Sequence, residues 1–297
     1  MNSQAGRIVV GYDGTEHSAA ALEWAAVHAQ HRDRPLTVLH VVDYAGMIAS
    51  PLGPFGWPDV HDEKVAAIAR AGAELARKQA GSIDISAVTR VAPVAGALIE
   101  FAGSAEMLVV GTRGHGDLAG SVLGSVAFAV GGHASCPVVV VRGRVGAPGS
   151  DRPVMVGVDC SSGSETAVRY AADLAAAAPA PLIIVCGYRI VASPAWTEAA
   201  YYDLESGGRP NFTTVARESA QNAVISAART ARTAHPELKI REQILEGVPA
   251  RALIRAADQA GILVVGSRGH GGFAGLKLGS VSHALIHAAP CPVAIVH

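Results

Sequence analysis

The sequence predicts an α/β protein built as two tandem domains, each a doubly wound parallel sheet with helices on both faces. The chain has 297 residues, about two domains at the usual length of about 150. A sequence unit recurs in both halves. Short apolar runs, such as 107–110 and 138–141, alternate with Ala-rich helical stretches. Strands separated by helices run parallel with right-handed crossovers, which gives the predicted fold.

The repeat is clearest around a glycine-rich segment. Gly-Thr-Arg-Gly-His-Gly at 111–116 returns as Gly-Ser-Arg-Gly-His-Gly at 266–271, an offset of 155. Val-Gly-Tyr-Asp at 10–13 returns as Val-Gly-Val-Asp at 156–159, an offset of 146. The nine additional residues of copy two therefore lie between its first strand and its glycine loop. Residues 143–152 are rich in Gly, Pro and charge, as in a linker, so we predict domains at 1–147 and 148–297.

The elements of copy one follow from its patterning. We expect strands at 8–10, 36–42, 85–91, 107–110 and 138–141, and helices at 18–32, about 62–80, 96–103 and 125–131. Parallel sheets of this kind bind ligands at the carboxyl ends of their strands, where the strand order reverses. The residues that follow the first and fourth strands should therefore meet in one crevice.

Composition excludes several classes of protein. Half of the residues are hydrophobic and 16% are charged, with Lys+Arg 24 against Asp+Glu 25, so the chain is too apolar to be disordered. A pI near 6.9 argues against nucleic acid as a partner. Mean hydropathy is +0.30, yet the apolar runs are far shorter than the roughly 20 residues of a membrane span. Without a secretion signal or C-x-x-C spacing, we expect a cytoplasmic protein with no membrane span.

The glycine loops have the chemistry of a phosphate site. In copy one, Gly-x-x-Gly at 111–114 is followed after nine residues by Gly124 and Ser125 at the start of a helix, and copy two repeats this spacing. Glycine lets consecutive N–H groups turn inward as an anion nest, and the helix start adds further N–H donors. Ser125 and its equivalent Ser280 stand where a hydroxyl either caps the helix or reaches a phosphate. The alternative is a structural turn that was duplicated with its domain.

These motifs, with Cys-Pro-Val-Val-Val-Val at 136–141, resemble the universal stress protein family in its ATP-binding branch, over the whole chain. The resemblance implies Rossmann-like, five-stranded sheets of order 3-2-1-4-5 that bind ATP with Mg²⁺ or Mn²⁺ and dimerise through the last strand. It implies that Asp13 and Asp159 lie near the ribose and phosphates, that Gly11 and Gly157 give the backbone room, and that the backbone at Val41 holds the adenine.

The nucleotide-binding residues predicted from the loops and from the resemblance fall into two matching sets, one for each copy. They are Gly11, Asp13, Val41, Gly111, Thr112, Arg113, Gly114, His115, Gly116, Asp117, Gly124, Ser125 and Val126 in copy one, and Gly157, Asp159, Gly266, Ser267, Arg268, Gly269, His270, Gly271, Gly272, Gly279, Ser280, Val281 and Ser282 in copy two.

The loops lack the catalytic parts of a P-loop. That motif needs G-x-x-x-x-G-K-[ST], whereas Lys277 precedes the second Gly-Ser pair and Val122 holds the same place in copy one. We therefore predict a regulatory stress-response protein in which ATP is a ligand that shifts populations, with at most weak ATPase activity. The alternatives are a slow ATP hydrolase that uses His115 or His270, and an interaction scaffold that binds no nucleotide.

Several other residues have a structural interpretation beside the functional one. Asp13 and Asp159 could be helix caps instead of ligand contacts. His28 and His31 could hold a metal, but no partner has metal-site spacing, so a solvated or partly buried pair is favoured. Cys136 and its equivalent in copy two start apolar strands and should be buried thiols. Cys160 lies beside Asp159 and is a candidate for redox modification.

Two long loops and two strand edges suggest contacts with other segments or molecules. The Pro-rich loops at 43–58 and 189–210 could be lids over the nucleotide, a surface for an unidentified protein partner, or packing over the sheet. The last strands, 138–141 and 293–296, are apolar edges that could pair with each other, with another chain as a homodimer, or with both.

Overall fold

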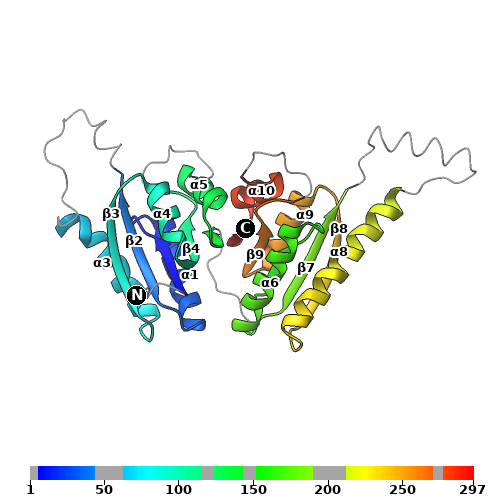
Figure 1. Cartoon of the computed structure of the whole chain (residues 1–297), viewed down its shortest axis with the longest axis horizontal. Helices are drawn as coiled ribbons and strands as arrows, with labels where there is room; N and C mark the ends of the chain where they lie inside the picture. The colour runs from blue at the N-terminus through cyan, green and yellow to red at the C-terminus, as the bar shows by residue number, and fades with distance from the viewer. Residues whose placement is uncertain (1–5, 44–62, 115–123, 143–151, 190–211, 270–276) are drawn as a thin grey trace, which may run out of the picture.

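The computed structural model describes residues 6–43, 63–114, 124–142, 152–189, 212–269 and 277–297, and it shows two copies of one α/β unit (Figure 1). Copy one contains β1 (Arg7–Gly11), α1 (Glu16–His31), β2 (Leu36–Val42), α3 (Glu63–Gln79), β3 (Ile85–Val91), α4 (Val94–Ala102), β4 (Ala105–Gly111), α5 (Ser125–His133) and β5 (Val138–Val141). Copy two contains β6 (Val154–Gly157), α6 (Ser162–Ala177), β7 (Leu182–Tyr188), α8 (Phe212–Ala234), β8 (Ile240–Glu246), α9 (Pro249–Ala256), the 3₁₀ turn η1 (Ala257–Gln259), β9 (Ile262–Gly266), α10 (Ser280–Ala288) and β10 (Val293–Val296).

The strands form one ten-stranded sheet of order β3-β2-β1-β4-β5-β10-β9-β6-β7-β8. Within each copy the pairing is parallel and the order is 3-2-1-4-5, so the predicted fold class is confirmed. The strand order reverses between β1 and β4, and again between β6 and β9. In each copy the strand order thus reverses between the first and fourth strands, which is where the sequence predicted a ligand-binding crevice.

The two halves of the sheet meet through β5 and β10, which pair antiparallel. Val138 lies opposite Ile295, Val139 opposite Ala294 and Val140 opposite Val293. The contact is therefore two-fold symmetric about the pair Val139 and Ala294, which are equivalent residues of the two copies. Of the pairings left open by the sequence, the structure therefore adopts the one within the chain. In this structure β5 pairs with β4 and β10, and β10 pairs with β9 and β5, so both sides of each last strand are occupied within the chain.

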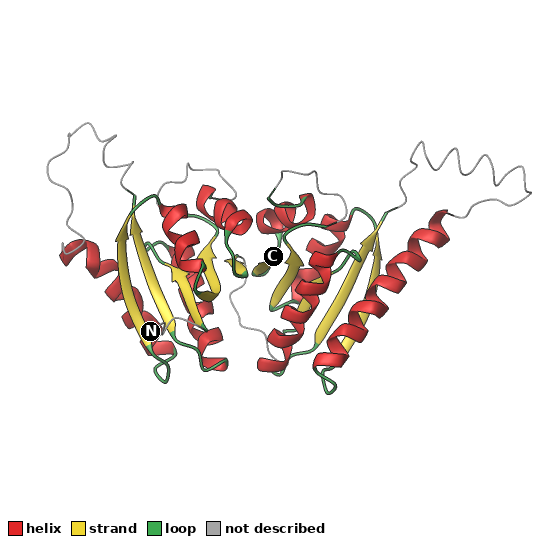
Figure 2. Ribbon diagram, in the orientation of Figure 1, coloured by secondary structure: helices red, strands yellow, loops and turns green. Residues whose placement is uncertain are grey.

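Helices cover both faces of the sheet (Figure 2). One buried layer joins side chains of α1, α3, α6 and α8 to the strands, and a second joins those of α4, α5, α9 and α10. Along β1, Ile8 and Val10 point into the first layer and Val9 into the second, and all three are buried. Burial on both faces explains why the strands are continuous apolar runs, and why the chain is so hydrophobic.

Some predictions lie outside the described residues. They include the linker that contains the 147/148 boundary and most of the two Pro-rich loops. The nine additional residues of copy two fall between β7 and β8, because β7 begins 146 residues after β2 whereas β8 begins 155 after β3. Among the described residues, no helix is long and apolar enough to cross a bilayer.

Candidate functional site

A short hydrogen bond brings the start of each glycine loop to the start of the helix that follows it. The N–H of Gly124 donates to the carbonyl of Thr112 at 2.7 Å, and the N–H of Gly279 donates to Ser267 at 2.7 Å. Both glycines have extended backbones and are the N-caps of α5 and α10, without a side-chain cap. Ser125 and Ser280 are the first helical residues, so the alternative in which their hydroxyls cap the helix is wrong.

Asp13 is held by the loop between β1 and α1. Its Oδ1 accepts hydrogen bonds from the N–H and the hydroxyl of Thr15, at 3.0 and 2.7 Å. Thr15 is the N-cap of α1 and accepts from the N–H of Ser18. The alternative that Asp13 itself caps the helix is therefore wrong. Asp13 instead orients the capping residue, which fixes the position of its own carboxylate.

Copy two repeats this arrangement with an additional bond. Oδ1 of Asp159 accepts from the N–H of Ser161 at 3.1 Å and from its hydroxyl at 2.6 Å. It also accepts from the hydroxyl of Ser164 at 2.6 Å, whereas the equivalent Ser18 donates to the carbonyl of Thr15. Ser161 is the N-cap of α6. Oδ1 of Asp159 therefore holds the hydroxyls of both Ser161 and Ser164.

The glycines of the loops are required by close contacts. A Cβ at Gly111 would lie 2.6 Å from the carbonyl oxygen of His17, and one at Gly266 would lie 2.9 Å from the backbone of Gly163. Further along each loop, a Cβ at Gly114 would lie 2.7 Å from Oδ2 of Asp13, and one at Gly269 would overlap Oδ2 of Asp159. Each glycine backbone thus lies directly against the aspartate that follows the first strand of its copy.

In copy one these groups line a cavity of about 580 Å³, within the usual range for small-molecule sites. Backbone of the glycine loop and the start of α5 form one part of its wall. Apolar side chains, among them Val41, Ile68, Val94 and Leu98, form another part, next to the end of β2. The cavity brings together the predicted residues Gly11, Asp13, Val41, Gly111, Thr112, Arg113, Gly114, Gly124, Ser125 and Val126.

Not every predicted residue can be placed in a site. His115, Gly116 and Asp117, with His270, Gly271 and Gly272, lie outside the described residues. Ser282 is buried, and its hydroxyl donates to the carbonyl of Gly266 at 2.7 Å, so it braces the loop instead of facing a ligand. The remaining predicted residues of copy two, Gly157, Asp159, Gly266, Ser267, Arg268, Gly269, Gly279, Ser280 and Val281, occupy positions equivalent to those of copy one.

The sequence reasoning missed a pair of residues that end the last strands. Arg142 follows β5, and burial together with the nearby Arg113 lowers its pKa. Its equivalent 155 residues later is His297, whose pKa is lowered by partial burial, by Arg268 and by His133. Each loop arginine thus has a second basic side chain nearby, fixed by its position after the fifth strand of each copy.

The histidines and cysteines outside the loops behave as structural groups. His28 is buried and stacks on Trp24 with ring centroids 4.8 Å apart, and burial, with Arg32 and His31, lowers its pKa to about 3. No group of three His, Cys, Asp or Glu side chains suited to a metal occurs in the described part of the chain. Cys136 and Cys291 are buried, whereas Cys160 is exposed and adopts φ 64°, like its equivalent Gly14 at 85°.

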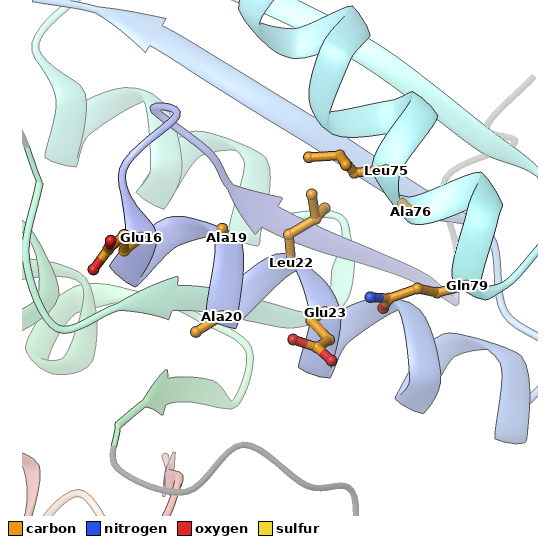
Figure 3. Close-up of a pocket in the computed structure, with 8 residues that line it drawn as sticks. All are labelled: Glu16, Ala19, Ala20, Leu22, Glu23, Leu75, Ala76 and Gln79. Atoms are coloured by element: carbon orange, nitrogen blue, oxygen red, sulfur yellow. The ribbon is translucent and has the colours of Figure 1, made fainter.

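A separate groove between α1 and α3 has the wrong chemistry for a phosphate (Figure 3). It measures about 370 Å³ and presents the carboxylates of Glu16 and Glu23 beside small apolar side chains. Its walls are mostly the sides of two helices, where backbone N–H groups beyond the first turn are bonded within the helix. The cavity at the carboxyl ends of the strands is therefore the candidate functional site.

Comparisons with known proteins agree with this architecture. The model of the universal stress protein family matches residues 5–142 and 152–297. Universal stress protein Rv2623 of Mycobacterium tuberculosis is 33% identical over 302 residues, which cover 99% of this chain and 97% of that protein. Rv2005c of the same organism is 32% identical over 295 residues, with coverages of 97% and 96%.

A solved universal stress protein from Archaeoglobus fulgidus has the same fold. Its TM-score is 0.66 at 19% identity, with 100% of this chain and 99% of that chain covered. The family model matches each copy separately, and the relatives extend over both. The chain therefore belongs to the universal stress protein family, as two tandem copies of the family's unit.

Proposed function

We propose that the protein binds ATP at one site in each copy and that ATP acts as a regulatory ligand in a stress response. The observation that carries this proposal is the cavity of copy one, which joins a wall of backbone from the glycine loop and the start of α5 to apolar side chains at the end of β2. N–H groups at a helix start favour phosphate, and apolar walls favour a flat base. The repeated loop geometry supports a second site in copy two.

The position of the aspartates favours a divalent cation with the nucleotide. Oδ2 of Asp13 lies so close to Gly114 that phosphates bound by the loop would meet its negative charge. Mg²⁺ is usually held by one or two carboxylates together with phosphate oxygens and water. Asp13 and Asp159 therefore fit a Mg²⁺ or Mn²⁺ that arrives with the triphosphate and screens this repulsion.

The described loops favour binding over hydrolysis. Neither Gly-Ser pair carries the lysine of a P-loop, and the charge near the first loop comes from Arg113 and Arg142, which are not proton acceptors. All four cysteines are unpaired in the structure, which supports the reducing environment of the cytoplasm. A protein partner that reads the nucleotide state completes the proposed regulatory role.

The proposal is tested by analysing the nucleotide that the purified protein releases on denaturation, and by titrating nucleotide-free protein with ATP and Mg²⁺. We expect released ATP and two binding events. ATP at 100 times its dissociation constant should stabilise the protein by about 2.7 kcal/mol at each site. Gly114→Val and Gly269→Val should each remove one binding event, because a side chain there displaces the neighbouring carboxylate.

Gly96→Ala is the control, because no heavy atom lies within 4 Å of a Cβ at Gly96, in the first turn of α4. Release of ADP, with steady phosphate production from added ATP, would instead indicate the slow hydrolase. If no nucleotide is released and ATP leaves the melting temperature unchanged, the protein is a scaffold and the proposal is wrong.

A further inference from the structure

The two sites differ at the end of the second strand, away from the glycine loop. The pairing of Gly11 with Leu39 in copy one and of Gly157 with Val185 in copy two fixes the alignment of β2 with β7. The bonds from Ala92 to Val42 and from Gly247 to Tyr188 confirm the same register. His40 is therefore equivalent to Cys186, Val41 to Gly187, and Asp43 to Arg189.

In copy one, this part of the cavity presents hydrogen-bond acceptors. His40 lines the cavity, and its Nδ1 lies 2.9 Å from the carbonyl of Tyr12. A carbonyl only accepts, so Nδ1 donates here, and in the tautomer with its single proton on Nδ1 the Nε2 atom is an acceptor. Asp43 lines the same cavity, and an ionised carboxylate accepts only.

In copy two, donors occupy the equivalent positions. Arg189 replaces Asp43, and a guanidinium has five N–H donors and no acceptor. Cys186 replaces His40, and its buried thiol is a weak donor. The apolar wall differs as well. In copy one the side chains of Val41 and Val94 both line the cavity. In copy two Gly187 takes the place of Val41, and a Cβ there would lie 2.8 Å from the Cα of Pro249.

A purine presents a different group to each of these surroundings. Adenine carries an exocyclic amino group at position 6, which donates, whereas guanine and hypoxanthine carry an oxygen there, which accepts. If the glycine loop holds the phosphates, as proposed above, the apolar wall at the end of the second strand is where the base fits. Acceptors there suit a 6-amino group, and arginine suits a 6-oxo group.

We propose that the two sites select different purines: the site of copy one selects 6-aminopurine nucleotides, and the site of copy two selects 6-oxopurine nucleotides. Asp43 and Arg189 are the specificity-determining residues. This inference rests on the proposed nucleotide binding and extends it, because ATP can enter both sites while only the first discriminates in its favour. One chain would then respond to the balance of two purine pools.

The experiment compares ATP with inosine triphosphate, which differs from ATP in carrying oxygen at position 6 and a proton on N1. Titration calorimetry is done on two single-site proteins, Gly269→Val, which keeps the first site, and Gly114→Val, which keeps the second. We expect ATP to bind about 10-fold or more tighter than inosine triphosphate at the first site, a modest effect for a paired polar group. At the second site we expect inosine triphosphate to bind at least as tightly as ATP.

Exchanging the charges tests the residues themselves. Asp43→Asn in the first single-site protein should bring the two affinities together, because an amide both donates and accepts. Arg189→Asp in the second should shift the preference toward ATP. Both positions are exposed, so folding is retained, and the melting temperature of each variant verifies this. Asp84→Asn, at the opposite end of the sheet, is the control that should change neither ratio.

The failure of this inference is distinguishable from failure of the proposed function. If both sites bind nucleotide with the same ATP preference, or if Asp43→Asn and Arg189→Asp leave the ratios unchanged, base selection is overturned and nucleotide binding stands. If neither nucleotide binds to either single-site protein or to the unmodified chain, both are overturned.

Discussion

The closest backbone contact in the first glycine loop gives the sharpest test of its structural role. In Gly111→Ala, the new Cβ would lie 2.6 Å from the carbonyl oxygen of His17, 2.7 Å from its carbonyl carbon and 3.1 Å from the N–H nitrogen of Ser18. Ordinary contact begins at 3.4 Å, so β4 and the start of α1 must separate by several tenths of an ångström. All three contact atoms belong to the backbone, so side-chain rotation cannot relieve the overlap.

Overpacking a well-packed site costs about 1–3 kcal/mol, and backbone contacts place Gly111→Ala at about 3 kcal/mol. For a protein of this size that corresponds to a fall of about 6–12 °C in melting temperature. Gly96→Ala provides the opposite case. It lies within α4 with open space around it, and alanine is favoured over glycine in a helix by about 1 kcal/mol, so its melting temperature should rise by about 2–4 °C.

The assay is thermal unfolding of both variants without nucleotide, so that ligand binding does not contribute. The reasoning is refuted if Gly111→Ala melts within 2 °C of the unmodified protein, or if the two substitutions shift the melting temperature in the same direction. A small shift would mean that β4 and α1 tolerate separation, and that glycine at 111 serves the ligand alone.

Further predictions concern pH, thiol reactivity and the junction of the two copies. The pKa of His28 is about 3 in the folded protein and about 6.5 in the unfolded chain, so the folded state loses stability as the pH falls from 6.5 towards 3. At pH 4.5, urea unfolding should show that the free energy of unfolding has fallen by about 2.7 kcal/mol, and His28→Phe should not show this fall. Iodoacetamide at pH 8 should label Cys160 alone by mass spectrometry, because the other three thiols are buried with pKa values raised to about 11 or 12; a label on Cys160→Ser would contradict this. The double variant Val139→Cys/Ala294→Cys, oxidised, should stay at 30.3 kDa on a non-reducing gel, whereas a band at twice that mass would show pairing between chains.

Sequence patterns predicted the elements well because each depends on nearby residues. Apolar runs and their flanking turns located β1 to β5 within a few residues, and glycine spacing located both loops. The sequence could not predict which residue is the N-cap of α5, because Gly124 and Ser125 are both acceptable N-caps and only the backbone angles distinguish them. The sequence did reveal Asp13 as a loop residue, but not that Thr15 takes the cap.

What could not be predicted depends on residues that are distant in the chain. Arg142 lies near Arg113 because β5 pairs beside β4, which places the end of β5 next to the end of β4. The difference between Asp43 and Arg189 emerged only when the register of β2 and β7 was known, since the two copies differ in length around these loops. The choice among partners for the last strands also needed the assembled sheet.

The exchange of equivalent residues across β5 and β10 has an evolutionary consequence. A symmetric pair made from two identical chains carries every substitution twice, so a change useful in one pocket is imposed on the other. In this chain the same symmetric contact joins two copies that occupy different parts of one sequence. A substitution in one copy therefore leaves the other copy unchanged. Tandem repetition of the unit in one chain thus lets the two copies diverge in sequence while the antiparallel β5–β10 pairing is retained.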